Sequence, residues 1–154
     1  MTIIAAMSKD RLIGINNKMP WHISEESKHF RRTTTGNVIL MGRKTFESVG
    51  GKPLPGRPHV IVSRTMPETD GIDVCRSLEE AIGQAESYGK EVFICGGGEI
   101  YREALSTSDR MILSYIEGDY EGDAYFPEFD EDEWEITKND VHDKFTVVYY
   151  ERKA

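Results

Sequence analysis

The segment Val92-Phe93-Ile94-Cys95-Gly96-Gly97-Gly98-Glu99-Ile100-Tyr101 decides how this chain folds. It begins with a short apolar run typical of a buried strand, continues with three consecutive glycines, and resumes with a pattern that suits a helix. Glycine loses much conformational freedom on folding, so three in succession are expected only where the backbone bends tightly or contacts something. The segment therefore predicts a strand, a tight turn and a helix, the repeating unit of an α/β protein.

The same unit recurs toward the N-terminus. The predicted buried strands cover 3–7, 38–41, 60–62 and 92–95, and the predicted helices begin at Ser24, span 43–48 and 78–88, and follow Gly98. The helix over 78–88 opens with a capping box of Ser77 and Glu80 and ends at Gly89. Strands that alternate with helices pair in parallel through right-handed crossovers, with helices on both faces of the sheet.

The final third of the chain has a different pattern. Strands are predicted over 110–117, 134–140 and 145–152, with no helix between them. Such strands pair antiparallel, so they complete a mainly parallel sheet with antiparallel C-terminal strands. At 154 residues the chain fits one domain, which we assign to residues 1–154.

Composition excludes several classes of protein. No apolar stretch approaches the length of a membrane span, and residues 1–7 lack a basic leader, so we expect no membrane association and a cytoplasmic protein. Cys75 and Cys95 are isolated, and the four histidines form no metal-binding pattern. We therefore expect reduced thiols and no metal site.

The net charge of −8 is concentrated in one segment. Residues 117–135 carry ten acidic and no basic side chains, and the rest of the chain carries 19 basic and 17 acidic ones. An acidic protein is a poor partner for nucleic acid, so we expect none, but the remainder can attract a small anion. We expect the acidic segment to be a solvated loop and strand edge; adaptation to high salt and a cation-binding loop are the alternatives.

A second informative segment surrounds the first predicted helix. With Ser24 as N-cap, Glu25 and Glu26 fall in the first turn, where the helix dipole favours carboxylates. The spacing places Glu26 beside Ile23 and Phe30, whereas Glu25 shares another side with His29 and Arg32. Glu26 is therefore the carboxylate with apolar neighbours and a candidate ligand-binding group. The alternative is that both glutamates are ordinary surface residues of a helix start.

Three predicted strand ends suit phosphate groups. The first continues as Gly42-Arg43-Lys44-Thr45, the second as Ser63-Arg64, and the third is the glycine run 96–98. Glycine allows close approach, the cations supply charge, and helix N-termini present free N–H groups. The glycine run does not have the Rossmann spacing, so a tight turn remains an alternative to a pyrophosphate site. Together the cations favour a cofactor with an extra ribose phosphate, NADPH rather than NADH.

Motifs along the whole chain now indicate a family. They are Ala5-Ala6, Ile13-Gly14, Asn17-Lys18-Met19-Pro20-Trp21, Glu26 with Phe30, Met41 to Ser48, Pro53 to Arg57, Ser63, Gly96 to Tyr101, and Gly122-Asp123. In this order they resemble the dihydrofolate reductase family. The resemblance implies NADPH-dependent reduction of dihydrofolate to tetrahydrofolate, on a mainly parallel eight-stranded sheet with about four helices.

The resemblance also implies residue roles. Glu26 would bind the pterin edge, Trp21 would hold a water near it, and Met19 would belong to a loop over nicotinamide, within a lid over residues 8–19. The implied substrate contacts are Ala6, Glu26, Ser27, Phe30, Val49, Leu54, Arg57 and Ser114, with Arg57 on the glutamate tail, Thr34 near the pocket floor and Lys52 as a second basic candidate. The implied cofactor contacts are Ala6, Ile13, Gly42, Arg43, Lys44, Thr45, Ser63, Arg64, Cys95, Gly97, Gly98, Glu99, Tyr101 and Asp123.

Some positions depart from the family pattern. Ser27 stands where many members have an apolar residue, and Glu26 is one methylene longer than an aspartate. Both positions lie where diaminopyrimidine antifolates bind, so we expect reduced sensitivity to trimethoprim. Glu99 occupies a position at which some relatives have a basic residue. The alternatives are another NADPH-dependent reductase on the same fold, of the riboflavin-pathway type, and a folate- or nucleotide-binding module without turnover. We expect a monomer.

Overall fold

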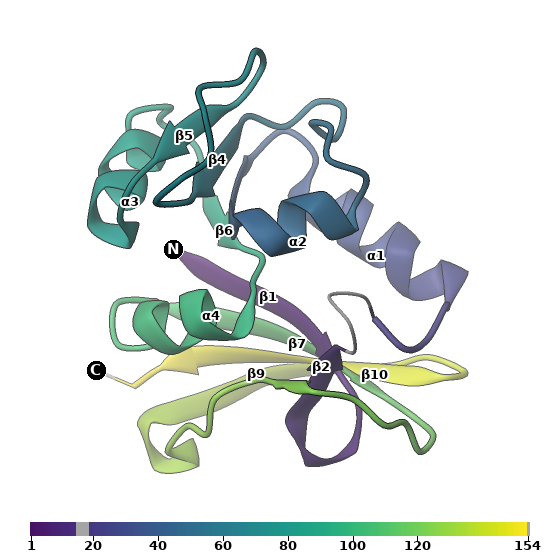
Figure 1. Ribbon diagram of the computed structural model, residues 1–154. Coiled ribbons are helices and arrows are strands. Elements are labelled where there is room, and N and C mark those ends of the chain that lie inside the picture. Colours follow the sequence, from purple (N-terminus) through teal and green to yellow (C-terminus); the bar gives the residue numbers. More distant parts are fainter. Residues whose placement is uncertain (15–18, 154) are drawn as a thin grey trace.

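The computed structural model describes residues 1–14 and 19–153, with their secondary structure shown in Figure 1. The helices are α1 (Ser24–Thr34), α2 (Arg43–Ser48), α3 (Leu78–Glu86) and α4 (Gly98–Ala104), with short 3₁₀ turns η1 (Lys9–Arg11) and η2 (Glu131–Glu133). The strands are β1 (Thr2–Met7), β2 (Leu12–Gly14), β3 (Val38–Gly42), β4 (His59–Val62), β5 (Asp73–Cys75), β6 (Val92–Ile94), β7 (Arg110–Ile116), β8 (Ala124–Tyr125), β9 (Trp134–Val141) and β10 (Phe145–Arg152).

Eight strands form one sheet in the order β5-β4-β3-β6-β1-β7-β10-β9. The first six strands in this order, from β5 across to β7, pair with their neighbours in parallel. Strand β10 pairs antiparallel with both β7 and β9. The remaining strands, β2 and β8, form a separate antiparallel ladder. The predicted fold class, a mainly parallel eight-stranded sheet with antiparallel C-terminal strands and four helices, is confirmed.

Alternating side chains on the strands build a core on each face of the sheet. On one face, Val38 and Leu40 of β3 pack in a cluster with residues of α3 and α4. On the other face, Ile39 and Met41 join a cluster that includes Phe46 of α2 and Phe30 of α1. Strands covered on both faces read as continuous apolar runs, which is why the sequence identified them.

The structure also corrects several details. Helix α1 has Ile23 as its N-cap and no side-chain cap, so the prediction that Ser24 caps it is wrong; Ser24 is the first helical residue. Helix α3 ends at Glu86 rather than at residue 88, although Ser77 does accept a hydrogen bond from the Glu80 amide at 3.1 Å. The short strands β2, β5 and β8 were not predicted, because two or three residues are too few to show a period.

The carboxyl ends of β3, β4, β5 and β6 meet at one edge of the sheet, as parallel pairing requires. The segments that follow these strands are therefore neighbours in space, although up to about fifty residues of chain separate them. Ligands of open α/β sheets bind at this edge. This edge positions the predicted site.

Candidate functional site

Glu26 is a buried carboxyl group in the first turn of α1. Its side chain is 8% exposed and has no hydrogen-bond partner among the described residues. Burial raises the pKa of Glu26 from 4.5 to about 7, because a carboxylate loses hydration there. Neighbouring Glu25 is exposed and lies 3.5 Å from the Lys28 ammonium. The predicted difference between the two glutamates is therefore present in the structure.

His29 does not lie where the spacing argument placed it. It was grouped with the exposed Glu25 and Arg32, yet it is 5% exposed. The reason is that His29 follows Glu26 by three residues and so shares its buried side. Burial, then nearby Arg32, lowers the pKa of His29, so the ring is neutral at pH 7.

A second group oriented by the structure is Arg57. Its Nε donates to the Pro55 carbonyl at 3.0 Å and its Nη1 to Thr34 Oγ1 at 3.1 Å. Thr34 in turn donates to the Phe30 carbonyl at 2.8 Å. The guanidinium is thus fixed from two sides, and Nη2 has no partner among the described residues. A fixed guanidinium with free N–H groups suits a carboxylate ligand.

Several predicted ligand contacts are apolar residues of one core cluster. Phe30 and Leu54 pack against the same core cluster as Cys95, so three predicted ligand contacts come together there. Trp21 is 7% exposed and its buried Nε1 donor has no partner in the described structure. Buried donors are rarely left unsatisfied, so Trp21 fits the predicted bound water.

Other predicted contacts are placed less decisively. Val49 and Met19 are about half exposed, at 41% and 51%. Ser27 is exposed, and its Oγ donates to the carbonyl of Ile23, the N-cap of the same helix, at 3.4 Å. Ser114 is 1% exposed and sits in β7 opposite Ala6 of β1. Their ligand contacts stay predictions.

The glycine run lies against the start of α2. The Gly42 amide donates to the Gly96 carbonyl at 2.8 Å. A Cβ added at Gly97 would lie 3.3 Å from Thr45 Oγ1, and one at Gly98 would lie 3.1 Å from the Tyr125 carbonyl oxygen. Side chains here would crowd the turn, so the glycines keep backbone accessible beside a threonine hydroxyl, as a pyrophosphate requires.

Tyr101 and Cys95 complete this part of the site. The Tyr101 hydroxyl donates to the Ile4 carbonyl at 2.8 Å. Burial raises the pKa of Tyr101 and of Cys95, so both remain protonated at neutral pH. Neither supplies charge to the site.

The predicted ribose-phosphate residues follow β3 and β4. Arg43 is partly engaged, with Nε 3.1 Å from Glu47 Oε1 and Nη1 3.4 Å from Thr65 Oγ1. Ser63 Oγ accepts the Met66 amide at 3.0 Å, which leaves its proton free to donate to an anion. Lys44 and Arg64 are exposed. The cations lie along adjacent strand ends, as the phosphate hypothesis requires.

Comparison with known proteins identifies the family. The family described as dihydrofolate reductase matches residues 1–152. Dihydrofolate reductase of Bacillus subtilis (strain 168) is 36% identical over 99% of this chain and 95% of its own length. Dihydrofolate reductase HdrB of Haloferax volcanii is 38% identical over 98% of this chain and 82% of its own. The chain belongs to the dihydrofolate reductase family.

A solved structure extends this likeness to three dimensions. Dihydrofolate reductase from Enterococcus faecalis, complexed with NADP(H) and RAB-propyl, superposes with a TM-score of 0.90 at 30% identity, over 99% of this chain and 96% of that one. The fold of this dihydrofolate reductase therefore agrees with its sequence family.

Sequence reasoning missed Arg76 in this dihydrofolate reductase. Its Nη1 donates to the carbonyls of Ser63 at 3.0 Å and of Met66, so it holds the turn that carries Ser63. Arg76 directly follows β5, a strand too short to be predicted. The sequence feature that could have indicated this role is a basic residue directly after the apolar pair Val74-Cys75.

The remaining predicted cofactor residues surround the β2–β8 ladder of the reductase. Ile13 is partly buried on the core cluster that contains Tyr101, and the Asp123 amide donates to the Gly14 carbonyl at 2.9 Å. Glu99 is exposed at the start of α4. Asn17, Lys18 and the centre of the predicted lid lie outside the described residues.

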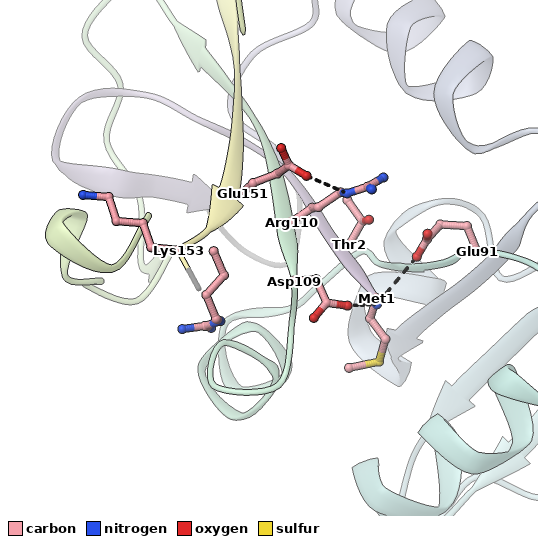
Figure 2. Close-up of a pocket in the computed structure, with 8 residues that line it drawn as sticks. Met1, Thr2, Glu91, Asp109, Arg110, Glu151 and Lys153 are labelled. Atoms are coloured by element: carbon pink, nitrogen blue, oxygen red, sulfur yellow. Dashed lines mark hydrogen bonds and ion pairs between the residues drawn. The ribbon is translucent and has the colours of Figure 1, made fainter. Parts of the chain in front are cut away.

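The opposite edge of the sheet carries a different cavity, of about 460 Å³. Figure 2 shows several of its charged groups paired with one another: Arg110 with Glu151, and the Met1 ammonium with Glu91 and Asp109. None of the predicted site residues lines it. The described residues contain no cluster of His, Cys, Asp or Glu able to hold a metal, and no described helix is long and apolar enough to span a membrane.

Proposed function

We propose that this dihydrofolate reductase binds the pterin edge of its substrate through Glu26 and the glutamate tail through Arg57. As a member of its family the enzyme reduces 7,8-dihydrofolate to 5,6,7,8-tetrahydrofolate with NADPH. The observation that supports the residue assignment is Glu26, a buried carboxyl group with no hydrogen-bond partner among the described residues and a pKa that burial raises. A buried polar group of this kind calls for a polar ligand.

The chemistry of Glu26 follows from its burial. The ionised carboxylate accepts two hydrogen bonds from the amidine-like edge of the pterin, which favours the charged form and lowers the raised pKa. NADPH, when bound, supplies the hydride. Because Glu26 binds the far edge of the ring, the proton reaches the ring nitrogen through water, and the free Trp21 Nε1 donor holds that water.

The two ends of the substrate are held differently. Phe30 and Leu54 form apolar walls for the ring system. Beyond them, Arg57 binds the α-carboxylate of the tail with the N–H groups that Thr34 and Pro55 leave free. We assign Ala6, Ser27, Val49 and Ser114 to the same site as minor contacts.

The cofactor site follows the strand ends. Gly97, Gly98 and Thr45 fit the pyrophosphate, since side chains at the glycines would crowd the turn. Arg43, Ser63 and Arg64 fit the ribose phosphate that distinguishes NADPH from NADH. Ile13 and Tyr101 flank the nicotinamide ring. Lys44, Cys95, Glu99 and Asp123 border this site.

The activity is tested by following nicotinamide absorbance with purified protein, NADPH and dihydrofolate. We expect oxidation that requires dihydrofolate and slows strongly with NADH. No oxidation by folded protein that binds NADPH would favour the binding module. Oxidation with a riboflavin-pathway substrate instead of dihydrofolate would favour the other reductase.

Adding trimethoprim to the same assay tests the departures at positions 26 and 27. Loss of a leucine-sized contact at Ser27 costs about 1–3 kcal/mol of binding energy, so inhibition should be about 5- to 150-fold weaker than in a relative with an apolar residue there. Nanomolar inhibition would contradict this.

We also propose a monomeric, cytoplasmic enzyme; light scattering on a sizing column tests the oligomeric state.

A further inference from the structure

Two consecutive residues before β2 have left-handed backbone conformations. They are Asp10, with φ 60°, and Arg11, with φ 63°. Aspartate tolerates this region better than most residues, but arginine rarely adopts it. A non-glycine residue stays there only when its surroundings hold it. The contacts of Arg11 show what does so.

Arg11 binds both backbone polar groups of Phe126. The Phe126 amide donates to the Arg11 carbonyl at 2.8 Å, and Arg11 Nη1 donates to the Phe126 carbonyl. Nη2 lies 3.2 Å from Glu128 Oε1, a carboxylate that is 85% exposed. The β2–β8 ladder is only two or three residues long, and so short a pair is not stable alone. Arg11 therefore fixes β2 to the rest of the protein.

Phe126 connects these Arg11 hydrogen bonds to the part of the site proposed to bind nicotinamide. Phe126 is fully buried, and its ring centroid lies 5.0 Å from that of Tyr101. Tyr101 is itself fixed by its hydrogen bond to Ile4. Ile13, in the middle of β2, packs on the same core cluster. Of the two proposed nicotinamide neighbours, Tyr101 therefore contacts Phe126 directly, and Ile13 packs against the cluster that contains Phe126.

We propose that Arg11 is a positioning residue for the nicotinamide-binding surface, which it sets by fixing β2, and with it Ile13, against Phe126. The inference rests on the proposed function, because that function places nicotinamide between Ile13 and Tyr101. Arg11 acts through these residues and does not itself touch the ring.

The test compares ligands that do and do not carry nicotinamide. Isothermal titration measures the binding of three ligands: NADPH, dihydrofolate and 2′,5′-ADP. The last has the ribose phosphate and one of the two pyrophosphate phosphates but no nicotinamide. Arg11→Met removes both side-chain bonds while keeping an apolar stem, and we expect NADPH to bind about tenfold more weakly. The affinities for 2′,5′-ADP and dihydrofolate should stay within about twofold of the wild type.

Two further variants separate the bonds. Glu128→Gln removes only the exposed ion pair, so its effect on NADPH should be less than about threefold. Arg110→Met, which loses an exposed ion pair at the opposite edge, should bind like the wild type. Arg11→Lys keeps the charge and can form one hydrogen bond, so its affinity for NADPH should lie between those of the wild type and Arg11→Met. If Arg11→Met does not fold, Arg11→Lys replaces it in the test.

Two results would overturn the inference: wild-type NADPH affinity in Arg11→Met, or an equal loss of NADPH and 2′,5′-ADP affinity, which indicates general destabilisation. If wild-type protein binds neither NADPH nor dihydrofolate, the proposed function fails and this inference with it. Normal wild-type binding with an unaffected Arg11→Met removes this inference alone.

Discussion

At the scale of single residues, burial rather than residue type distinguishes the groups of the site. Glu25 and Glu26 are chemically identical and adjacent, yet one is solvated and the other is 8% exposed. The sequence could predict this difference, because helical spacing placed Glu26 among apolar neighbours. It could not predict the Arg57 contacts with Thr34 and Pro55, since these depend on how a turn folds back onto α1.

The raised pKa of Glu26 predicts a stability that depends on pH. The folded state holds the Glu26 proton up to about pH 7, whereas the unfolded state releases it near pH 4.5. Glu26 therefore lowers the free energy of unfolding as pH rises from 4.5 through 7, by at most about 3 kcal/mol. Glu26→Gln should unfold at a higher urea concentration than wild type at pH 8 and at a similar one below pH 4.5. An equal difference at both pH values would refute this.

Arg57 predicts a split between substrates. Arg57→Met should raise KM for dihydrofolate about 10- to 100-fold, because a charge-assisted hydrogen bond to the tail is lost. KM for a dihydropterin without the glutamate tail should not change, and steady-state kinetics with both substrates measures the split. Lys52→Met, the second basic candidate, should have a smaller effect, since Lys52 is exposed and has no partner among the described residues. Equal effects of Arg57→Met on both substrates would argue against a tail contact.

At the scale of elements, the sequence predicted the strands that are buried on both faces and helices α1 to α4, because apolar patterns are local. Of the two predicted caps, only Ser77 of α3 is present. It missed β2, β5 and β8, because two or three residues are too few to show a period; β2 also pairs with a strand about 110 residues further along the chain. It therefore missed Arg76, whose role depends on β5 lying beside β4. It also missed the hydrogen bonds between Arg11 and Phe126, which depend on β2 lying beside β8. The missing part of the site is the part built by these short strands.

Helix α3 offers a matched pair of glycine substitutions. Gly83 lies inside the helix with nothing within 4 Å of an added Cβ, so Gly83→Ala should raise the free energy of unfolding by about 0.5–1 kcal/mol. Gly89 ends this segment with φ +69°, so Gly89→Ala should lower it by about 1 kcal/mol. Urea unfolding measures both. A stabilising Gly89→Ala would contradict the assigned helix end.

At the scale of the whole molecule, the excess of negative charge lies in one segment of the chain. The site lies at the carboxyl ends of the parallel strands, whereas residues 117–135 carry ten acidic side chains and no basic one. The sequence predicted that this segment is solvated, and the structure shows all ten acidic residues exposed. Their mutual repulsion destabilises the folded state and is screened by salt.

Raising KCl from about 0.02 to 0.5 M should therefore raise the thermal unfolding midpoint by a few degrees, because the Debye length falls from over about 10 Å to a few ångströms. Thermal scans at several KCl concentrations measure it. Measuring the unfolding midpoint also in MgCl₂, at the same ionic strength as KCl, distinguishes screening from a cation-binding loop. Equal midpoints in the two salts indicate screening. An unfolding midpoint that falls with salt would contradict the repulsion argument.

The most direct test of the central claim is kcat/KM for dihydrofolate at pH 7 in Glu26→Gln and in its matched control Glu25→Gln. The two substitutions remove the same charge one residue apart, but Glu26 is buried and has no partner among the described residues, whereas Glu25 is exposed and paired with Lys28. We predict a loss of more than about 100-fold in Glu26→Gln, since an ionic pair of hydrogen bonds to the pterin is removed, and less than about twofold in Glu25→Gln. Similar kcat/KM values in the two variants would show that Glu26 does not bind the pterin.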